Sequence, residues 1–211
     1  GFWVGHLFVP PEMSETLLRD ALSAHFDHAG LNPLYLEPGR VRPEALGAQA
    51  RQKPPQFWQI AGHVSNTENL EERLLHVQAA LERDFPCHFA SLSPHTVVYK
   101  VRGSVEVLAQ YYPDLRDRYF DTSAVMCHAR YSTNTVSTFE RAQPFALLGH
   151  NGEINTIQRL RQEAKQLGVP LVDGASDSQD VDRLLHTLCA YYHLDLIEAM
   201  EMVFPPSPHE I

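Results

Sequence analysis

The sequence predicts a layered fold of helices and sheet, in the α/β or α+β class. Strand-like segments rich in aromatic and β-branched residues alternate with segments whose apolar residues recur every three or four positions. In the second half, two further strand-like segments precede a stretch with helical patterns only. Because an amphipathic helix must bury its apolar face against another layer, this order favours sheets covered by helices.

The first half opens with an apolar strand and then alternates between the two element types. Ser14 precedes a helical pattern formed by residues 17–26, and its hydroxyl suits an N-cap. A second amphipathic pattern begins at Thr67 and runs to Leu81. The predicted strands cover residues 1–9, 34–36, 56–64, 88–92 and 96–100, with a polar loop rich in Pro and Gly at 37–55.

The second half is predicted to hold one short helix, two strands and three longer helices. The short helix at 105–111 ends before Pro113, because the residue preceding a proline leaves the helical region. The two strands cover 123–130 and 144–149, and the helices cover 154–167, 180–192 and 194–202.

Composition bounds the class of protein. The 211 residues with 44% hydrophobic content suffice for one core, so we expect one domain over residues 1–211. The formal net charge of -9 argues against nucleic acid and anionic membranes as partners. No apolar run approaches the ~20 residues that a membrane-spanning helix needs.

The cysteines and histidines do not form metal-binding patterns. The three cysteines, Cys87, Cys127 and Cys189, are far apart and odd in number, which favours neither a disulfide framework nor a zinc site. No histidine pair has the His-Glu-x-x-His spacing of zinc proteases. We therefore expect no metal, and a reducing compartment, the cytoplasm.

Two polar segments each follow a predicted strand, at residues 128–135 and 149–156. In the second, Asn151-Gly152 suits an oxyanion hole, because an Asn side-chain amide and the next backbone N–H can both donate. The alternative is a tight turn, since Asn-Gly is the commonest turn dipeptide. On the dipeptide alone the turn is favoured.

Two charged residues are candidates for holding an amino acid. Arg130 ends a predicted apolar strand, where a guanidinium can bind a carboxylate with two hydrogen bonds. A structural ion pair is an equally good explanation. Asp177 precedes a helix and could receive an ammonium group, whereas helix capping by the Ser176-Asp177-Ser178 segment is the simpler alternative.

Three strings occur in a fixed order: HARYSTNT at 128–135, AQPF at 142–145 and GHNGEINT at 149–156. Together they resemble the glutaminase domain of glutamate synthases, a class II glutamine amidotransferase. The resemblance covers nearly the whole chain and is strongest over 92–205. It implies the fold of N-terminal nucleophile hydrolases, an α+β four-layer αββα sandwich, here with its N-terminal part missing.

The resemblance also implies a reaction and roles for residues. A cysteine at the mature N-terminus attacks the carboxamide of glutamine, with its own α-amino group as base, and ammonia is released. Asn151 (side chain) and Gly152 (backbone) would form the oxyanion hole. Arg130, assisted by Thr133, would hold the α-carboxylate of glutamine, and Asp177 would bind its α-ammonium group.

Residue 1 is Gly, and no Cys-Gly opening is present. We therefore expect a partial domain, with a segment preceding Gly1 in the intact protein, that is inactive alone. Its partners would be glutamine and the remainder of the large subunit, which makes glutamate from 2-oxoglutarate. The resemblance implies no cofactor in this segment, because FMN and an iron–sulfur cluster belong to other domains of the family enzyme.

Other functions remain open at this stage. A non-catalytic glutamine-binding or regulatory module would keep Arg130 and Asp177 without a cysteine, and a structural remnant would bind nothing. A different class II amidotransferase fits the strings at 128–135 and 142–145 less well. If glutamine is the ligand, Arg130, Asn151 and Asp177 must converge on one pocket. The strands that end at Arg130 and Gly149 should then be neighbours in one sheet.

Overall fold

The structure, a computed structural model, describes residues 1–129 and 137–205. Its described part contains one four-stranded antiparallel sheet in the order β2-β3-β1-β4. β1 pairs with β3 along its whole length, from Phe2 opposite His63 to Val9 opposite Gln56. The strands are β1 (Phe2–Val9), β2 (Pro33–Pro38), β3 (Gln56–His63) and β4 (His88–Ser93).

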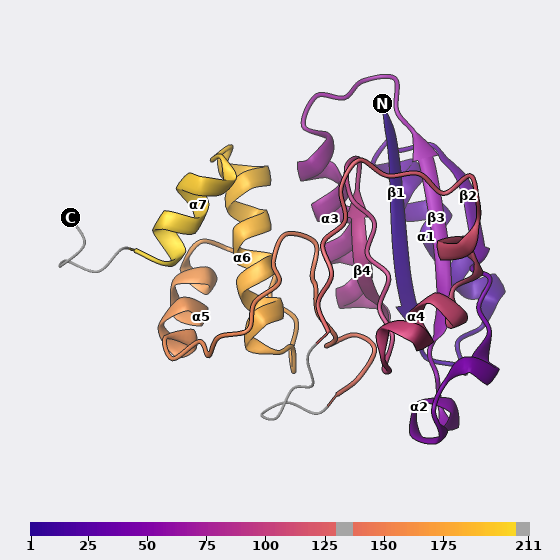
Figure 1. The fold of residues 1–211 in the computed structure, drawn as a ribbon. Coiled ribbons are helices and arrows are strands. Elements are labelled where there is room, and N and C mark those ends of the chain that lie inside the picture. Colours follow the sequence, from indigo (N-terminus) through magenta and orange to yellow (C-terminus); the bar gives the residue numbers. More distant parts are fainter. Residues whose placement is uncertain (130–136, 206–211) are drawn as a thin grey trace.

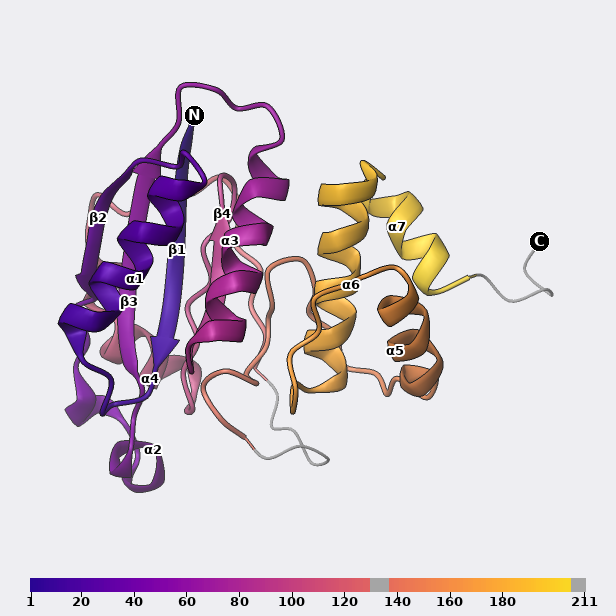
Figure 2. The same ribbon diagram turned by 180° about the vertical axis from the view of Figure 1, so that it is seen from behind.

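Two long helices, α1 (Glu15–His28) and α3 (Leu70–Asp84), cover one face of this sheet (Figures 1 and 2). As predicted, Ser14 caps α1, and its hydroxyl accepts the N–H of Leu17. The core under these helices is fully buried and apolar. At its centre, the rings of Trp3 and Phe26 stack with their centroids 4.5 Å apart.

The opposite face of the sheet is covered by short helices and irregular chain. An aromatic cluster lies there, and its rings pack edge to face or tilted. The loop predicted at 37–55 contains part of this cover as short helices. These elements are η1 (Pro43–Ala45), α2 (Ala48–Gln52), α4 (Val105–Tyr111) and η2 (Pro113–Arg116), and the rings are Phe8, Phe57, Tyr111, Tyr112 and Phe139.

Three helices at the C-terminal end form a lobe with a core of its own, which lies beside α3 and β4 (Figures 1 and 2). They are α5 (Ile157–Gln166), α6 (Asp177–Tyr192) and α7 (Leu196–Val203). α6 packs against α3, and Arg183 of α6 forms an ion pair with the buried Glu82 of α3. An ion pair therefore joins the lobe to α3, which covers the sheet.

The predicted helices and the strands at 1–9, 34–36, 56–64 and 88–92 are confirmed. Their observed ends lie within three residues of the predicted ones. Three predicted strands are wrong in the described residues: 96–100, 123–129 and 144–149 are irregular. The prediction that the last two are neighbouring strands is therefore wrong as well. The mixed α+β class is confirmed, while the second sheet of a sandwich is not seen among residues 1–129 and 137–205.

Several backbone groups of these irregular segments are hydrogen-bonded by side chains instead of a neighbouring strand. The Val98 N–H donates to the Ser91 hydroxyl, and the Tyr112 hydroxyl donates to the Lys100 carbonyl. The N–H groups of Leu147 and Leu148 both donate to Asp182 of α6. Strand-like composition alone thus did not produce strands, because a strand needs a partner for its backbone groups.

In the described ranges, no helix is both long enough and apolar enough to cross a membrane.

Candidate active site

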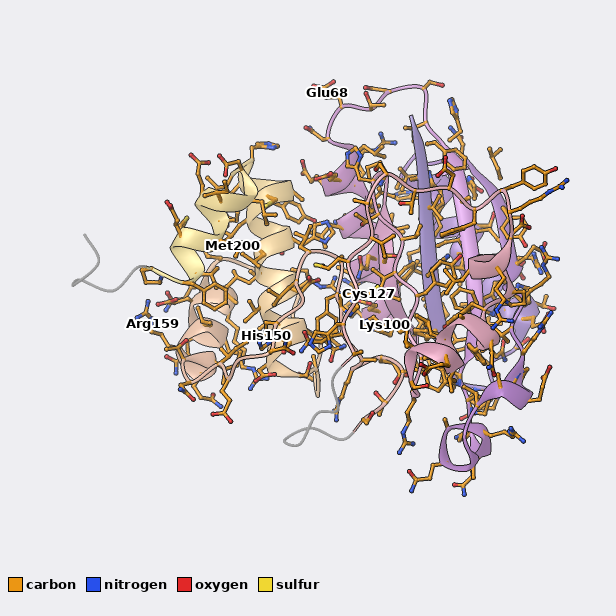
Figure 3. All side chains as sticks on the ribbon, viewed as in Figure 1. Glu68, Lys100, Cys127, His150, Arg159 and Met200 are labelled. Atoms are coloured by element: carbon orange, nitrogen blue, oxygen red, sulfur yellow. The ribbon has the colours of Figure 1, made fainter. Side chains whose placement is uncertain are left out.

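Three segments that carry the sequence motifs meet at His150, which lies beside α6 (Figure 3). Its backbone N–H donates to Oε1 of Gln143 at 2.8 Å. Its carbonyl lies 3.0 Å from Nε2 of His128, which must carry the proton to donate to it. Its ring Nε2 lies 2.7 Å from the hydroxyl oxygen of Ser178. The segment before Arg130, the Asn151-Gly152 loop and the start of α6 are thereby held together.

Asp177 is the first residue of α6, and the structure decides how that helix is capped. Ser176 is the N-cap, and with Gln179 it forms a capping box in which each side chain binds the other residue's backbone N–H. The capping alternative therefore describes Ser176, and Asp177 is not needed for it. Asp177 lies in the first turn of the helix, where a carboxylate interacts favourably with the helix dipole.

One oxygen of Asp177 is anchored and the other faces no described partner. Oδ1 accepts the Ser178 backbone N–H at 2.7 Å and the Ser178 hydroxyl at 3.3 Å. When that hydroxyl donates to Asp177, its oxygen accepts the Nε2–H of His150. Among residues 1–129 and 137–205, no hydrogen bond reaches Oδ2. This half-exposed carboxylate can accept an ammonium group of a ligand.

Asn151 and Gly152 lie exposed in the irregular segment between Leu148 and α5. The chain bends at both residues, which is compatible with the tight-turn alternative for this dipeptide as well as with an oxyanion hole. A Cβ added at Gly152 would meet nothing within 4 Å. The space beside its Cα is therefore open.

Arg130 and Thr133 lie outside the described residues. Their neighbour His128 donates to the His150 carbonyl at 3.0 Å. His150 thus contacts both His128 and Ser178, which are neighbours of predicted site residues in the sequence. The convergence of Arg130, Asn151 and Asp177 themselves on one pocket stays a prediction.

Two of the three cysteines are unsuited to nucleophilic attack. Burial, together with the nearby Glu82 carboxylate, raises the pKa of the Cys87 thiol to about 12. Burial, with Glu71 and Asp195, also raises the pKa of Cys189. Both thiols stay protonated at neutral pH, and the thiolate is the reactive form. Cys127 is exposed beside His128.

Sequence reasoning missed four residues that build this site. His128, Gln143 and His150 stand within or beside the three strings, so their position was available as a signal. Asp182 lies five positions after Asp177 on α6, and its Oδ1 accepts the Leu147 and Leu148 N–H groups at 2.8 and 2.9 Å. Only the folded chain reveals that role. In the described ranges, no group of three His, Cys, Asp or Glu side chains could hold a metal ion.

Comparison with known proteins identifies related sequences. Residues 2–210 match the family described as glutamine amidotransferases class-II. The chain is 34% identical over 166 residues to the chloroplastic ferredoxin-dependent glutamate synthase of Oryza sativa subsp. japonica, covering 74% of this chain and 10% of that protein. It is 33% identical over 150 residues to the NADH glutamate synthase of Saccharomyces cerevisiae, covering 64% and 7%.

A bacterial relative is similar to a shorter stretch. The large chain of the NADPH glutamate synthase of Azospirillum brasilense is 36% identical over 117 residues, which covers 48% of this chain and 8% of that protein. The chain thus spans about a tenth or less of the length of each of these relatives. With its family match over nearly every residue, the chain belongs to the class II glutamine amidotransferases.

Proposed function

We propose that this chain is the glutamine-binding part of the glutaminase domain of a glutamate synthase. The observation that carries the proposal is the set of contacts at His150, which join the segment before Arg130, the Asn151-Gly152 loop and the start of α6. The relatives named above are glutamate synthases, and the family match covers the same segments.

In this proposal three polar groups of glutamine have partners: the α-ammonium group, the α-carboxylate and the carboxamide oxygen. Oδ2 of Asp177 accepts the α-ammonium group, and Arg130 binds the α-carboxylate in a bidentate pair with help from Thr133. The Asn151 side-chain amide and the Gly152 backbone N–H donate to the carboxamide oxygen. During attack on the carboxamide carbon this oxygen becomes negatively charged, so these donors stabilise the transition state more than the bound substrate.

The nucleophile is the part that these residues do not supply. Cys87 and Cys189 hold their protons, and Cys127 is exposed, next to His128 in the sequence. We propose that the attacking thiolate comes from the remainder of the polypeptide, so that the 211-residue chain binds glutamine without hydrolysing it. An ammonia-release assay should therefore show no turnover. Turnover that Cys127→Ala abolishes would identify Cys127 as the nucleophile instead.

The finer fold assignment belongs to the same proposal. We infer that residues 123–130 and 144–149 become strands of a second sheet when partner strands from the remainder of the polypeptide are present, which gives the αββα sandwich. Ammonia would then pass to other domains for glutamate synthesis from 2-oxoglutarate. FMN and an iron–sulfur cluster would lie there, since three dispersed cysteines cannot supply the four thiolates of a cluster.

Calorimetry with L-glutamine tests the binding function. The chain should bind it, and Arg130→Ala should weaken binding by on the order of 2–5 kcal/mol, because Asp177 would keep only one end of the zwitterion. Arg159→Ala is the matched control, since Arg159 is exposed on α5 and pairs only with Glu163 in the described residues. No binding by the folded chain would favour a structural remnant. Equal binding by Arg130→Ala would place the pocket elsewhere.

A further inference from the structure

Lys100 is a buried lysine that has no role in the glutamine site proposed above. It follows β4 in the chain, it is 1% exposed, and the Tyr112 hydroxyl donates to its backbone carbonyl. Its ammonium group donates one described hydrogen bond, to the Glu140 backbone carbonyl at 3.2 Å. The same group lies over the Phe145 ring, 4.2 Å from its centre, where the ring face attracts a cation. Lys100 thus contacts the irregular segment that contains the AQPF string at two points.

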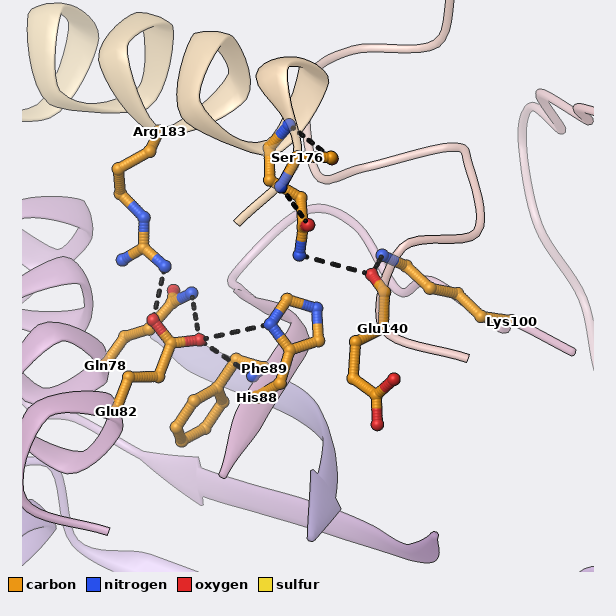
Figure 4. Close-up of polar contacts among 9 residues, drawn as sticks. Gln78, Glu82, His88, Phe89, Lys100, Glu140, Ser176 and Arg183 are labelled. Atoms are coloured by element: carbon orange, nitrogen blue, oxygen red, sulfur yellow. Dashed lines mark hydrogen bonds and ion pairs between the residues drawn. The ribbon is translucent and has the colours of Figure 1, made fainter. Parts of the chain in front are cut away.

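The first of these contacts leads to the start of α6 (Figure 4). The Glu140 carbonyl that binds Lys100 also accepts a hydrogen bond from Nε2 of Gln179, at 3.3 Å. Oε1 of Gln179 accepts the Ser176 backbone N–H at 2.9 Å, within the capping box of α6. Asp177 is the next residue along the helix. One carbonyl oxygen therefore connects Lys100 to the helix end that carries the proposed ammonium-binding carboxylate.

The second contact leads to the proposed oxyanion hole. Phe145 is buried, and Gln143 lies two residues before it in the same segment. Oε1 of Gln143 accepts the His150 backbone N–H at 2.8 Å, and His150 directly precedes Asn151-Gly152. The Phe145 ring under the Lys100 ammonium group therefore belongs to the segment that holds this loop.

The ammonium group of Lys100 is unfavourable for folding. None of the ion pairs in the described ranges includes Lys100, and burial of an unpaired charge is costly. Packing alone does not require this group, because an apolar side chain of similar length would fill the space without the cost. Its contacts with Glu140 and Phe145 therefore indicate a role other than packing.

We propose that Lys100 is a positioning residue of the glutamine site, whose ammonium group fixes the start of α6 and the Asn151-Gly152 loop relative to each other. It acts through the Glu140 carbonyl and the Phe145 ring, and it does not touch glutamine itself. The inference rests on the proposed glutamine-binding function and adds a residue to it.

The ionisation of Lys100 gives this role a pH dependence. Burial lowers the pKa of Lys100 to about 7, although nearby carboxylates oppose this shift. The protonated form attracts the Phe145 ring and donates a stronger hydrogen bond than the neutral amine. Glutamine should therefore bind the protonated form more tightly, and binding near pH 7.5 should take up protons. The charged and titratable groups around Lys100 are Asp182 and Arg183 of α6, Glu82 of α3, His88 of β4, Glu140 and the Tyr112 hydroxyl.

Calorimetry with L-glutamine at pH 6.5 and pH 8.5 tests the inference in the 211-residue chain. The wild type should bind roughly three- to tenfold more weakly at pH 8.5, the difference between a charged and a neutral donor. Lys100→Met should show the weaker affinity at both pH values. Lys165→Met, at an exposed lysine of α5, is the matched control and should keep the wild-type profile. All other titrating groups are common to the three proteins, so the comparison isolates Lys100.

Two further readouts separate positioning from a structural role. In urea at pH 6.5, Lys100→Met should have at least the unfolding free energy of the wild type, because it buries no charge. At pH 7.5, the heat of glutamine binding to the wild type should vary with the ionisation enthalpy of the buffer in the sense of proton uptake, and Lys100→Met should lack this uptake. Should Lys100→Met fail to fold, the neutral donor of Lys100→Gln takes its place, and the proton uptake of the wild type still decides.

The outcomes distinguish this inference from the proposed function. Equal glutamine affinity of Lys100→Met and wild type at pH 6.5 would overturn the inference alone, as would the absence of proton uptake by the wild type. A less stable Lys100→Met with unchanged affinity would show that Lys100 only supports the fold. No glutamine binding by the folded wild type at either pH would overturn the proposed function, and the inference with it.

Discussion

Nε2 of His150 lies 2.7 Å from the hydroxyl oxygen of Ser178, which in turn lies 3.3 Å from Oδ1 of Asp177. The residue before the proposed oxyanion hole is thus linked to the residue after the proposed ammonium-binding carboxylate. The two ends of a glutamine molecule would be held at a fixed separation by this pair of hydrogen bonds.

Breaking this link should weaken glutamine binding. Ser178→Ala and His150→Phe should each reduce affinity by about 0.5–1.5 kcal/mol, roughly two- to tenfold, because the hydrogen bond between these side chains is lost. Ser178→Ala also removes the longer hydrogen bond to Asp177. The double variant should lose little more than either single one, since both changes remove the same contact. Calorimetry on the four proteins measures this coupling. Additive losses would show that the contact does not position the site.

The buried ion pair between α3 and α6 should be a major source of stability for the junction between sheet and lobe. Arg183→Met leaves Glu82, whose side chain is 1% exposed, without its charged partner. We expect about 3–5 kcal/mol of destabilisation in urea unfolding. Arg159→Met, in the exposed pair with Glu163, should leave the unfolding free energy nearly unchanged.

A double variant separates the cost of leaving Glu82 without a partner from the net contribution of the ion pair to stability. Glu82→Leu combined with Arg183→Met should recover much of the stability, because no unpaired charge is then buried. If Arg183→Met unfolds like the wild type, the lobe is not joined to the sheet through this pair.

Stability should fall as the pH drops from 6.5 towards 4. Burial lowers the pKa of His6 to about 4 from 6.5, so between these values the unfolded chain binds a proton that the folded chain does not. This difference lowers the free energy of unfolding by about 3 kcal/mol by the time the pH reaches 4. His6→Phe should reduce the dependence of the unfolding free energy on pH. The part that remains should come from His88 and His186, whose pKa values are also lowered.

Urea unfolding between pH 7 and pH 4.5 measures this slope. The His6 ring already packs against Phe57 and Tyr99, with centroids 4.9 and 4.5 Å away, so phenylalanine fits the same space. His28→Gln, at an exposed position, is the control and should keep the wild-type slope. An unchanged slope in His6→Phe would mean that His6 is protonated in the folded state.

Close packing at β3 predicts that Gly62 tolerates no side chain. A Cβ there would meet atoms of the Trp3 ring at 2.3 and 2.5 Å and the Asn32 carbonyl oxygen at 2.7 Å. Gly62→Ala should cost about 1–3 kcal/mol through overpacking. Gly47→Ala is the control, since an added Cβ there meets nothing within 4 Å. Thermal unfolding should therefore separate the two variants clearly.

Local sequence patterns predicted the helices and strands whose caps, apolar faces and partner strands are all present in this chain. The helix after Ser14 and the strands β1 and β3 were found because capping and burial follow directly from residue type and spacing. The strands predicted at 123–130 and 144–149 have equally suitable composition. They are irregular in the described residues because a strand also needs a neighbour, and composition does not show whether one is present.

The candidate site was predictable where side-chain chemistry alone fixes a role, and not where distant contacts fix it. Asn151, Gly152 and Asp177 could be proposed from donor and acceptor chemistry together with the resemblance. The contact of His150 with Ser178 joins residues 28 positions apart, and Asp182 reaches Leu147 across 35 positions. Such contacts depend on how α6 packs, which spacing along the chain does not determine.

Chemical-shift mapping tests most directly whether glutamine binds between the Asn151-Gly152 loop and the start of α6. L-glutamine titrated into the nitrogen-15-labelled chain should shift the Gly152 backbone amide, the Asn151 side-chain amide and the Asp177 amide with one saturation curve. The exposed Gly168 should not move. Unchanged signals at all three positions, or shifts confined to another part of the chain, would contradict the account.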